Sequence, residues 1–177
     1  GPGYMAPDFY AAQIWTSALG GGMSSRLFQR IREERGLCYS IFAQSGFHDD
    51  TGMVTIYAGT SGEQIADLAN LTIDELKRAA VDMTEAEIAR ARAQLKAGLL
   101  MGLESPTGQA ERMARSLAIW GRVADPAEVA ERIDAVTVAD VRAHAEALIG
   151  NARPALALYG PVRSAPSRAR LAERLAA

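Results

Sequence analysis

Residues 20–39 read GGGMSSRLFQRIREERGLCY, and this stretch decides which fold we expect. Its three glycines allow backbone conformations that other residues avoid, which predicts a loop at 20–22. Ser24 or Ser25 can then cap a short helix, since a hydroxyl accepts hydrogen bonds from the unpaired N–H groups of the first turn. Gly36 suits the left-handed residue that follows a helix. The stretch therefore predicts a loop, a short helix and a turn into a strand.

Arg32 and Tyr39 are the residues of this stretch best suited to binding chemistry. Arg32 lies near the end of the expected helix and Tyr39 near the start of a strand expected from Leu37, so both side chains can project beside one turn. A guanidinium and a phenol hydroxyl together can bind the carbonyls of an extended peptide. A structural role is the alternative for both, with Arg32 on a solvated helix surface and Tyr39 as a half-buried strand aromatic.

The composition favours one folded domain and argues against a nucleic-acid binder. The 177 residues are 49% hydrophobic and carry a net charge of −2. A chain of this length can bury a sizeable core, and no basic stripe is present to neutralise phosphates. No apolar run approaches the roughly 20 residues that span a bilayer, so no membrane span is expected. Cys38 is the only cysteine, which excludes an intramolecular disulfide.

Sequence patterns on either side of the glycine loop predict a helix and a β-hairpin. Asp8 can cap a helix that runs through Leu19. Alternating apolar residues predict strands over 39–47 and 53–60. The sequence HDDTG at 48–52 is typical of the turn that would join them.

A mostly helical half follows. Five helix starts are expected from capping boxes or from a capping residue before proline: Ser61-x-x-Gln64, Thr84-x-x-Glu87, Ser105-Pro106, Asp125-Pro126 and Thr137-x-x-Asp140. Residues 155–159 (ALALY) resemble a strand, for which the hairpin is the obvious partner. The Arg- and Ala-rich tail, 163–177, is expected to form a terminal helix. Together these elements predict an α+β fold, with an antiparallel sheet packed against several helices.

The chain has only two histidines, His48 and His144, and neither lies in a metal-binding motif. Zinc sites need clustered His, Cys, Asp or Glu ligands. We therefore expect both histidines at the surface and no metal on this chain alone. The glycine loop also lacks the Gly-Lys-Ser/Thr ending of a P-loop, and no Gly-x-Ser-x-Gly elbow is present.

Five segments resemble the second-half, zinc-free domain of the M16 zinc metallopeptidases, the group of mitochondrial processing peptidase and pitrilysin. They are GGGMSSRLFQRIREERGLCYSIFA (20–43), DTGMVTIYAGT (50–60), MTEAEIARARAQLKAGLLMGLES (83–105), GR (121–122) and RPALALYGP (153–161). The similarity runs from about Asp8 to Pro161 and so covers nearly the whole chain.

The resemblance implies an M16 C-terminal, inactive and substrate-binding domain over residues 1–162, followed by the tail 163–177. Its fold would be that of the LuxS/MPP-like metallohydrolases, lacking the first strands. In such peptidases a zinc-free domain faces a zinc-bearing one and contributes an Arg and a Tyr to peptide binding and to stabilisation of the transition state. Through REERGLCY (32–39), these residues are Arg32 and Tyr39.

Gly20, Gly21 and Gly22 form a candidate loop for contact with substrate or with the neighbouring domain, and a plain structural turn is the alternative. By the resemblance, the chain is part of a zinc metalloendopeptidase and is inactive alone. Its expected partners are a zinc-bearing M16 domain or subunit and a peptide or unfolded protein substrate. The alternatives are a non-catalytic assembly subunit, like the respiratory core proteins, and an independent peptide-binding module. An unfilled sheet edge would also favour a homodimer.

No cofactor is expected on this chain, and zinc is expected on the partner. The chain begins at Gly1 rather than at Met, so we expect a fragment or a processed form. The expected setting is the cytoplasm of a bacterium, with the periplasm and the mitochondrial matrix as alternatives.

Overall fold

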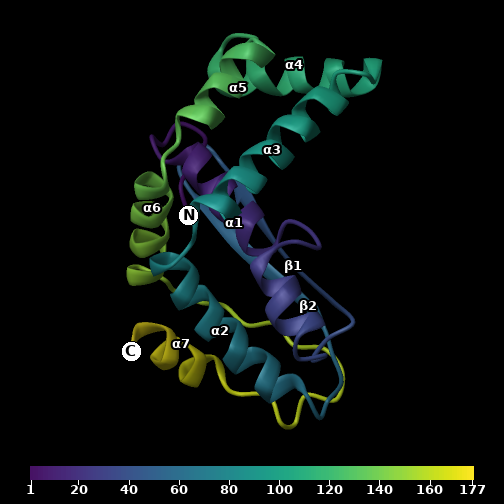
Figure 1. Ribbon diagram of the computed structural model, residues 1–177, viewed down its shortest axis with the longest axis vertical. Helices are drawn as coiled ribbons and strands as arrows, with labels where there is room; N and C mark the ends of the chain where they lie inside the picture. Colours follow the sequence, from purple (N-terminus) through teal and green to yellow (C-terminus); the bar gives the residue numbers. More distant parts are fainter.

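The computed structural model describes residues 1–177 and confirms an α+β fold, in which helices surround one two-stranded antiparallel sheet (Figure 1). In chain order the elements are α1 (Phe9–Gly20), the π-helix η1 (Phe28–Glu33), β1 (Ser40–Phe47), β2 (Gly52–Gly59), α2 (Ile65–Val81), α3 (Glu85–Gly102), α4 (Pro106–Trp120), α5 (Pro126–Ala135), α6 (Val138–Gly150) and α7 (Arg168–Ala176). No helix combines the length and the apolar character needed to cross a bilayer.

Helix α1 is the centre of the core. Ile14, Trp15 and Leu19 are fully buried on it, and the helix contacts β1, α3 and α6. The indole Nε1 of Trp15 donates a hydrogen bond to the carbonyl of Ala79 at the end of α2, 3.2 Å away. Because a buried indole N–H needs an acceptor, this bond ties the end of α2 to α1.

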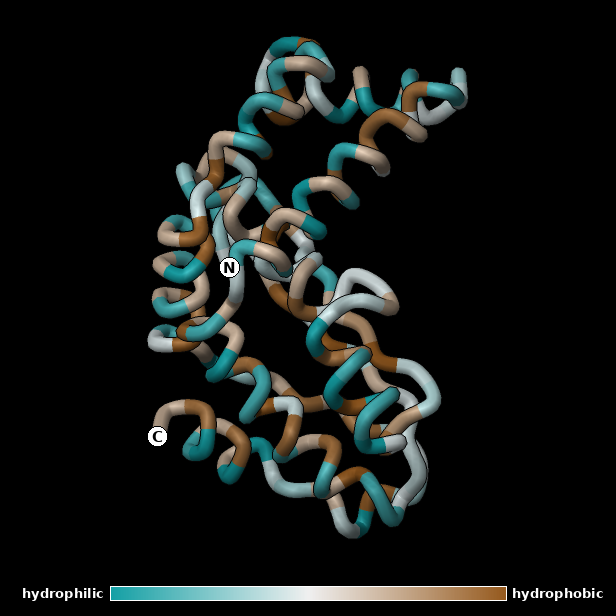
Figure 2. The backbone as a smooth tube through the Cα atoms, in the orientation of Figure 1, coloured by the Kyte–Doolittle hydropathy of each residue, from teal (hydrophilic) through white to brown (hydrophobic).

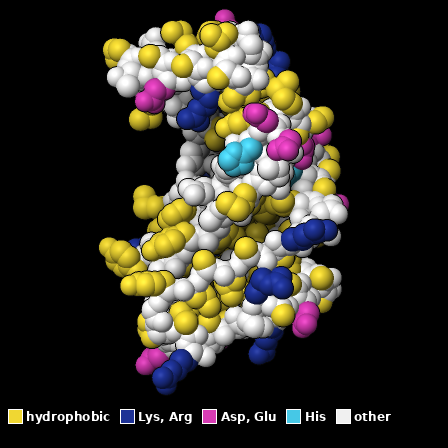
Figure 3. Space-filling view, turned by 180° about the vertical axis from the view of Figure 1, so that it is seen from behind, with side chains coloured by type: hydrophobic (Ala, Val, Ile, Leu, Met, Phe, Trp, Pro, Cys, Tyr) yellow, Lys and Arg dark blue, Asp and Glu magenta, His cyan; other side chains and the backbone are white.

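The hairpin is confirmed as predicted, with Ala43 of β1 opposite Ile56 of β2. Its inner face, including Ile41 and Ala43, packs against α1. On its outer face Phe42 and Tyr57 are cross-strand partners whose rings stack with centroids 5.1 Å apart. Figure 3 views the molecule from behind and shows hydrophobic side chains gathered across this region. The sheet therefore has one face covered by α1 and one aromatic face exposed.

Four of the five predicted helix starts after the hairpin are confirmed. Thr84 and Thr137 form full capping boxes at α3 and α6. Ser105 and Asp125 accept backbone N–H groups just before the prolines of α4 and α5. These starts are encoded locally, because a capping hydroxyl or carboxylate needs only the next turn of its own chain.

Two other caps differ from the prediction. Asp8 occupies the N-cap position of α1, but its carboxylate makes no capping bond and lies 2.7 Å from Nδ1 of His144. Gln64 is the N-cap of α2 without a side-chain bond, and Ser61 forms only the preceding turn, accepting from the Gln64 N–H at 3.3 Å. In the first case a tertiary contact has replaced a local one.

The helices α3 and α4 extend away from the core toward one end of the molecule (Figure 1). On α3, Ile88 is fully buried, whereas Leu100 and Met101 in the last turns are mostly exposed. Figure 2 shows this apolar end of α3 at the outer end of the molecule. The first half of α3 therefore belongs to the buried core, whereas its last turns do not.

The predicted strand at 155–159 is wrong. None of residues 153–161 takes part in a backbone hydrogen bond, and the sheet consists of β1 and β2 alone. A strand needs a partner edge within hydrogen-bonding distance, and this segment has an alternating pattern without one. Beyond it, Leu171 and Leu175 of α7 pack against Ile73 of α2. The boundary between a domain at 1–162 and a tail at 163–177 stays a prediction.

Candidate functional site

The helix predicted before Gly36 is present, but most of it is the π-helix η1. The Glu34 N–H donates to the carbonyl of Gln29, five residues back, over 2.9 Å. The proposed serine cap is wrong, because the Ser25 hydroxyl donates to the Gly22 carbonyl at 2.5 Å and η1 has no side-chain cap. Short π-helical turns are rare and occur frequently at functional sites.

The turn after η1 is pinned to the rest of the hairpin. Gly36 has φ +61°, the left-handed conformation that its position predicted. The Leu37 N–H donates back to the carbonyl of Ile31, and the Leu37 carbonyl accepts from the Thr60 hydroxyl at 2.5 Å. The strand begins at Ser40 rather than at Leu37. A turn held from both sides can place η1 and the start of β1 in one orientation.

Arg32 is held by three contacts. Its Nε donates to the backbone carbonyl of Tyr39 over 2.8 Å, and its guanidinium lies 4.6 Å from the centre of the Phe28 ring. A further ion pair joins Arg32 to Glu33. The Arg32 side chain is nevertheless 34% exposed, so the guanidinium is oriented by the protein while part of it faces solvent.

The Tyr39 side chain is exposed to solvent and is not packed against the core. It is 87% exposed, and its backbone N–H donates to the Gly59 carbonyl at 2.9 Å, which extends the ladder of the hairpin by one residue. The structure thus brings Arg32 and Tyr39 together beside one turn, as predicted. The guanidinium contacts the backbone of Tyr39, however, and leaves its phenol to solvent.

Phe28 and Glu33 belong to this arrangement and were missed in the sequence analysis. Phe28 is half-buried, and its ring lies under the Arg32 guanidinium. The available signal was the spacing of four residues between Phe28 and Arg32, at which helical side chains meet and a guanidinium can cover an aromatic ring.

The glycine loop has a structural reason that does not involve unusual φ angles. None of Gly20, Gly21 and Gly22 has positive φ, which corrects the expectation from their conformational freedom. A Cβ on Gly20 would lie 2.4 Å from the backbone nitrogen of Ala43, and one on Gly21 would lie 2.8 Å from the Ser17 carbonyl oxygen. Gly20 therefore lets α1 end directly against β1, and Gly21 lets the chain turn closely past Ser17 of α1.

The two histidines do not form a metal site. His48 lies in the hairpin turn, whereas His144 is buried, which corrects its expected surface position. Nδ1 of His144 is bonded to Asp8, and no group of three or more His, Cys, Asp or Glu side chains could hold a metal ion. The residues of this chain do not fit a zinc site.

A cluster of charged side chains around Arg26 holds the first part of the segment 20–39. The Arg26 guanidinium bonds to both carboxylate oxygens of Glu87, at 2.9 and 2.8 Å, and also to Asp82. Burial of Glu87 opposes its ionisation, but the hydrogen bonds from Arg26 and Thr84 outweigh it and lower the pKa of Glu87 to about 2. Arg26 therefore ties the segment to the start of α3.

Comparison with known proteins identifies the family to which this part of the chain is similar. Residues 1–95, slightly more than half of the chain, match the family model described as the peptidase M16 inactive domain. That range contains α1, the glycine loop, η1 and the hairpin.

Several curated bacterial proteins are similar over most of the chain. An uncharacterised zinc protease of Streptomyces coelicolor is 39% identical over 155 residues, which cover 87% of this chain and 34% of the relative. One from Mycobacterium tuberculosis is 37% identical over 164 residues, covering 91% and 37%, and YmxG of Bacillus subtilis is 34% identical over 161, covering 89% and 39%. The chain spans between a third and two fifths of the length of these relatives.

Two solved structures share the fold. A conserved protein from Enterococcus faecalis V583 superposes with a TM-score of 0.72 at 25% identity, covering 82% of this chain and 34% of that one. A chain of complex III2 from Candida albicans, with Inz-5 bound, gives a TM-score of 0.73 at 25% identity, covering 83% and 37%.

Proposed function

This chain belongs to the M16 peptidase family, as a member of its inactive-domain group, and on that premise we propose that it is the substrate-binding half of a zinc metallopeptidase. Cleavage would require a zinc-bearing M16 domain or subunit, on the same chain or on another, to supply a metal-activated water. The isolated chain would bind peptide or unfolded protein without cleaving it.

One observation carries the proposal: an oriented guanidinium and an exposed phenol lie at the same turn. Arg32 is fixed by Tyr39, Phe28 and Glu33, and its exposed edge can donate to a peptide carbonyl. The Tyr39 hydroxyl can donate a second hydrogen bond, and it would stabilise an oxyanion that develops on a carbonyl nearby. Donors fixed before substrate arrives bind at a lower entropic cost.

The glycine loop has a smaller part in the proposal. The packing of Gly20 and Gly21 against β1 and α1 already accounts for two of its three glycines. A Cβ on Gly22 would meet only the side chain of Gln94, at 3.3 Å, so Gly22 is the residue of the loop that could approach a neighbouring domain.

The test is complementation with a zinc-bearing M16 partner and a fluorogenic peptide. Arg32→Ala and Tyr39→Phe should each lower kcat/KM by at least about tenfold, as expected for loss of a hydrogen bond to a charged or developing charge. Arg35→Ala is the matched control, since Arg35 is an exposed arginine of the same turn with no ion pair. Unchanged turnover in both site variants would remove the assignment.

The likeness to a complex III chain favours a second candidate function, a non-catalytic assembly subunit. On that reading the exposed face of the hairpin and its residue Tyr39 would contact another subunit. The assembly-subunit function would be favoured if a partner with a competent zinc site binds this chain and the complex cleaves no peptide of a broad library. An independent peptide-binding module would instead bind peptides without any partner.

A further inference from the structure

A polar cavity of about 420 Å³ lies between η1, α2 and the start of α3. It is lined by residues such as Arg30 of η1, Glu75 of α2 and Arg90 of α3, and by no hydrophobic residue. Most ligand pockets of this size have a largely apolar lining, so this cavity suits a ligand without an apolar body. It lies on another side of η1 from Arg32, which contacts Phe28 and Tyr39 instead.

Glu75 gives the cavity an unused acceptor. Its side chain is only 3% exposed, and one carboxylate oxygen, Oε1, accepts from Arg78 at 3.1 Å. The other, Oε2, is buried and has no hydrogen-bond partner in the protein. Because a buried carboxylate oxygen without a donor is costly, Glu75 provides a place for a donor from a ligand, and a cationic donor would suit it best.

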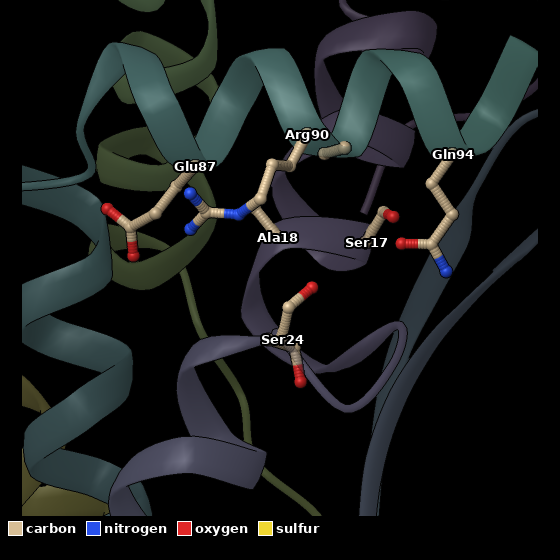
Figure 4. Close-up of a pocket in the computed structure, with 8 residues that line it drawn as sticks. Ser17, Ala18, Ser24, Glu87, Arg90 and Gln94 are labelled. Atoms are coloured by element: carbon tan, nitrogen blue, oxygen red, sulfur yellow. The ribbon is translucent and has the colours of Figure 1, made fainter.

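Arg90 gives the cavity an unused cation. The other three arginines of the lining form ion pairs: Arg26 with Asp82 and Glu87, Arg30 with Glu34, and Arg78 with Glu75 and Asp82. Arg90 makes no ion pair. Figure 4 shows its side chain beside Glu87 and above Ser24, in a narrow adjoining pocket. This pocket shares four lining residues with the cavity: Ser24, Ser25, Glu87 and Arg90.

The charge balance decides the class of ligand. Four arginines and four carboxylates line the cavity, so a strongly anionic or strongly cationic ligand would face as many like charges as opposite ones. A molecule with one ammonium and one carboxylate matches the two uncommitted groups and leaves the balance unchanged.

We propose that this cavity binds a small polar zwitterion of amino-acid or dipeptide size, with its ammonium group on Glu75 and its carboxylate on Arg90. The site is separate from the Arg32–Tyr39 pair, and the inference does not depend on peptide cleavage or on a zinc-bearing partner.

The test is isothermal titration calorimetry of the 177-residue chain with glycylglycine. We expect saturable binding with a Kd on the order of 1 mM. Glycylglycinamide lacks the carboxylate and N-acetylglycylglycine lacks the ammonium group, so each should bind at least about tenfold more weakly. Absence of saturable binding by glycylglycine, or equal binding of either blocked analogue, would overturn the proposal.

Two variants locate the site. Arg90→Gln and Glu75→Gln should each weaken glycylglycine binding by at least about tenfold, while Arg170→Gln on α7 should leave it unchanged. Arg90 is exposed and unpaired, so its variant stays informative even where Glu75→Gln disturbs folding, which circular dichroism would report. Unaltered affinity in folded Arg90→Gln, or equally tight binding of inorganic phosphate, would show that no zwitterion site exists there.

Discussion

The two ends of the segment 20–39 are held in contrasting ways. At the closed end, residues 20–26, Arg26 is 10% exposed and bonds to two carboxylates from the start of α3 and the turn before it. At the open end, residues 32–39, Arg32 is 34% exposed and is held by a backbone carbonyl, a ring face and its own neighbour. An arginine whose donors are consumed by buried partners serves the fold, whereas one oriented at the surface keeps donors for a ligand.

The largest effect should come from the closed end, at Gly20. Gly20→Ala should lower the free energy of unfolding by about 3 kcal/mol, because the new Cβ would lie 2.4 Å from backbone of β1 that cannot move aside cheaply. Urea unfolding measures the loss. Gly98→Ala is the control: its Cβ would meet nothing within 4 Å, and alanine favours a helix interior by about 0.5–1 kcal/mol. Equal stabilities of the two variants would mean that α1 does not end against β1.

Removal of Arg26 should have the next largest effect. Arg26→Ala should cost about 2 kcal/mol, since Glu87 and Asp82 lose their shared partner and Asp82 is half exposed, which moderates the loss. A double-mutant cycle of Arg26→Ala with Glu87→Ala measures the coupling energy between these two side chains, apart from their other contacts. A coupling energy near zero would contradict the closed end as an anchor.

The pH dependence of stability should report the same contact more weakly. Because the pKa of Glu87 is lowered from 4.5 to about 2 in the folded chain, its stabilising contribution is complete above pH 4.5 and is lost as the pH falls toward 2. Wild type should therefore lose about 1 kcal/mol more than Glu87→Gln over this interval, allowing for solvent screening. Parallel pH profiles of the two proteins, followed by urea unfolding, would argue against the lowered pKa.

The smallest stability effects should come from the open end. Tyr39→Phe and Arg32→Ala should change the free energy of unfolding by no more than about 0.5 kcal/mol. The Tyr39 phenol is exposed, and the Arg32 guanidinium makes only weak interactions at the surface. Thermal unfolding beside Arg35→Ala gives the comparison. A loss at Arg32 as large as that at Arg26 would show that both ends serve the fold and would weaken the binding proposal.

Much of the fold could be predicted because the signals are local. The hairpin follows from alternation around a turn, and the starts of α3 to α6 follow from caps within one turn of the chain. The proximity of Arg32 and Tyr39 was also local, since Gly36 has the left-handed turn that its position indicates. The predicted strand at 155–159 failed because alternation describes a face and not the presence of a partner edge.

The sequence alone determined the hairpin, the starts of α3 to α6, the turn that joins Arg32 to Tyr39, and the family resemblance. Only the tertiary structure decided how those residues are used. It moved the Asp8 carboxylate from a cap to buried His144, and it placed the Arg32 guanidinium against the backbone carbonyl of Tyr39. It also left one oxygen of Glu75 without a partner inside a polar cavity. Caps and turns are short-range and are encoded within a few residues, whereas burial and hydrogen-bond partners depend on segments that meet only when the chain has folded.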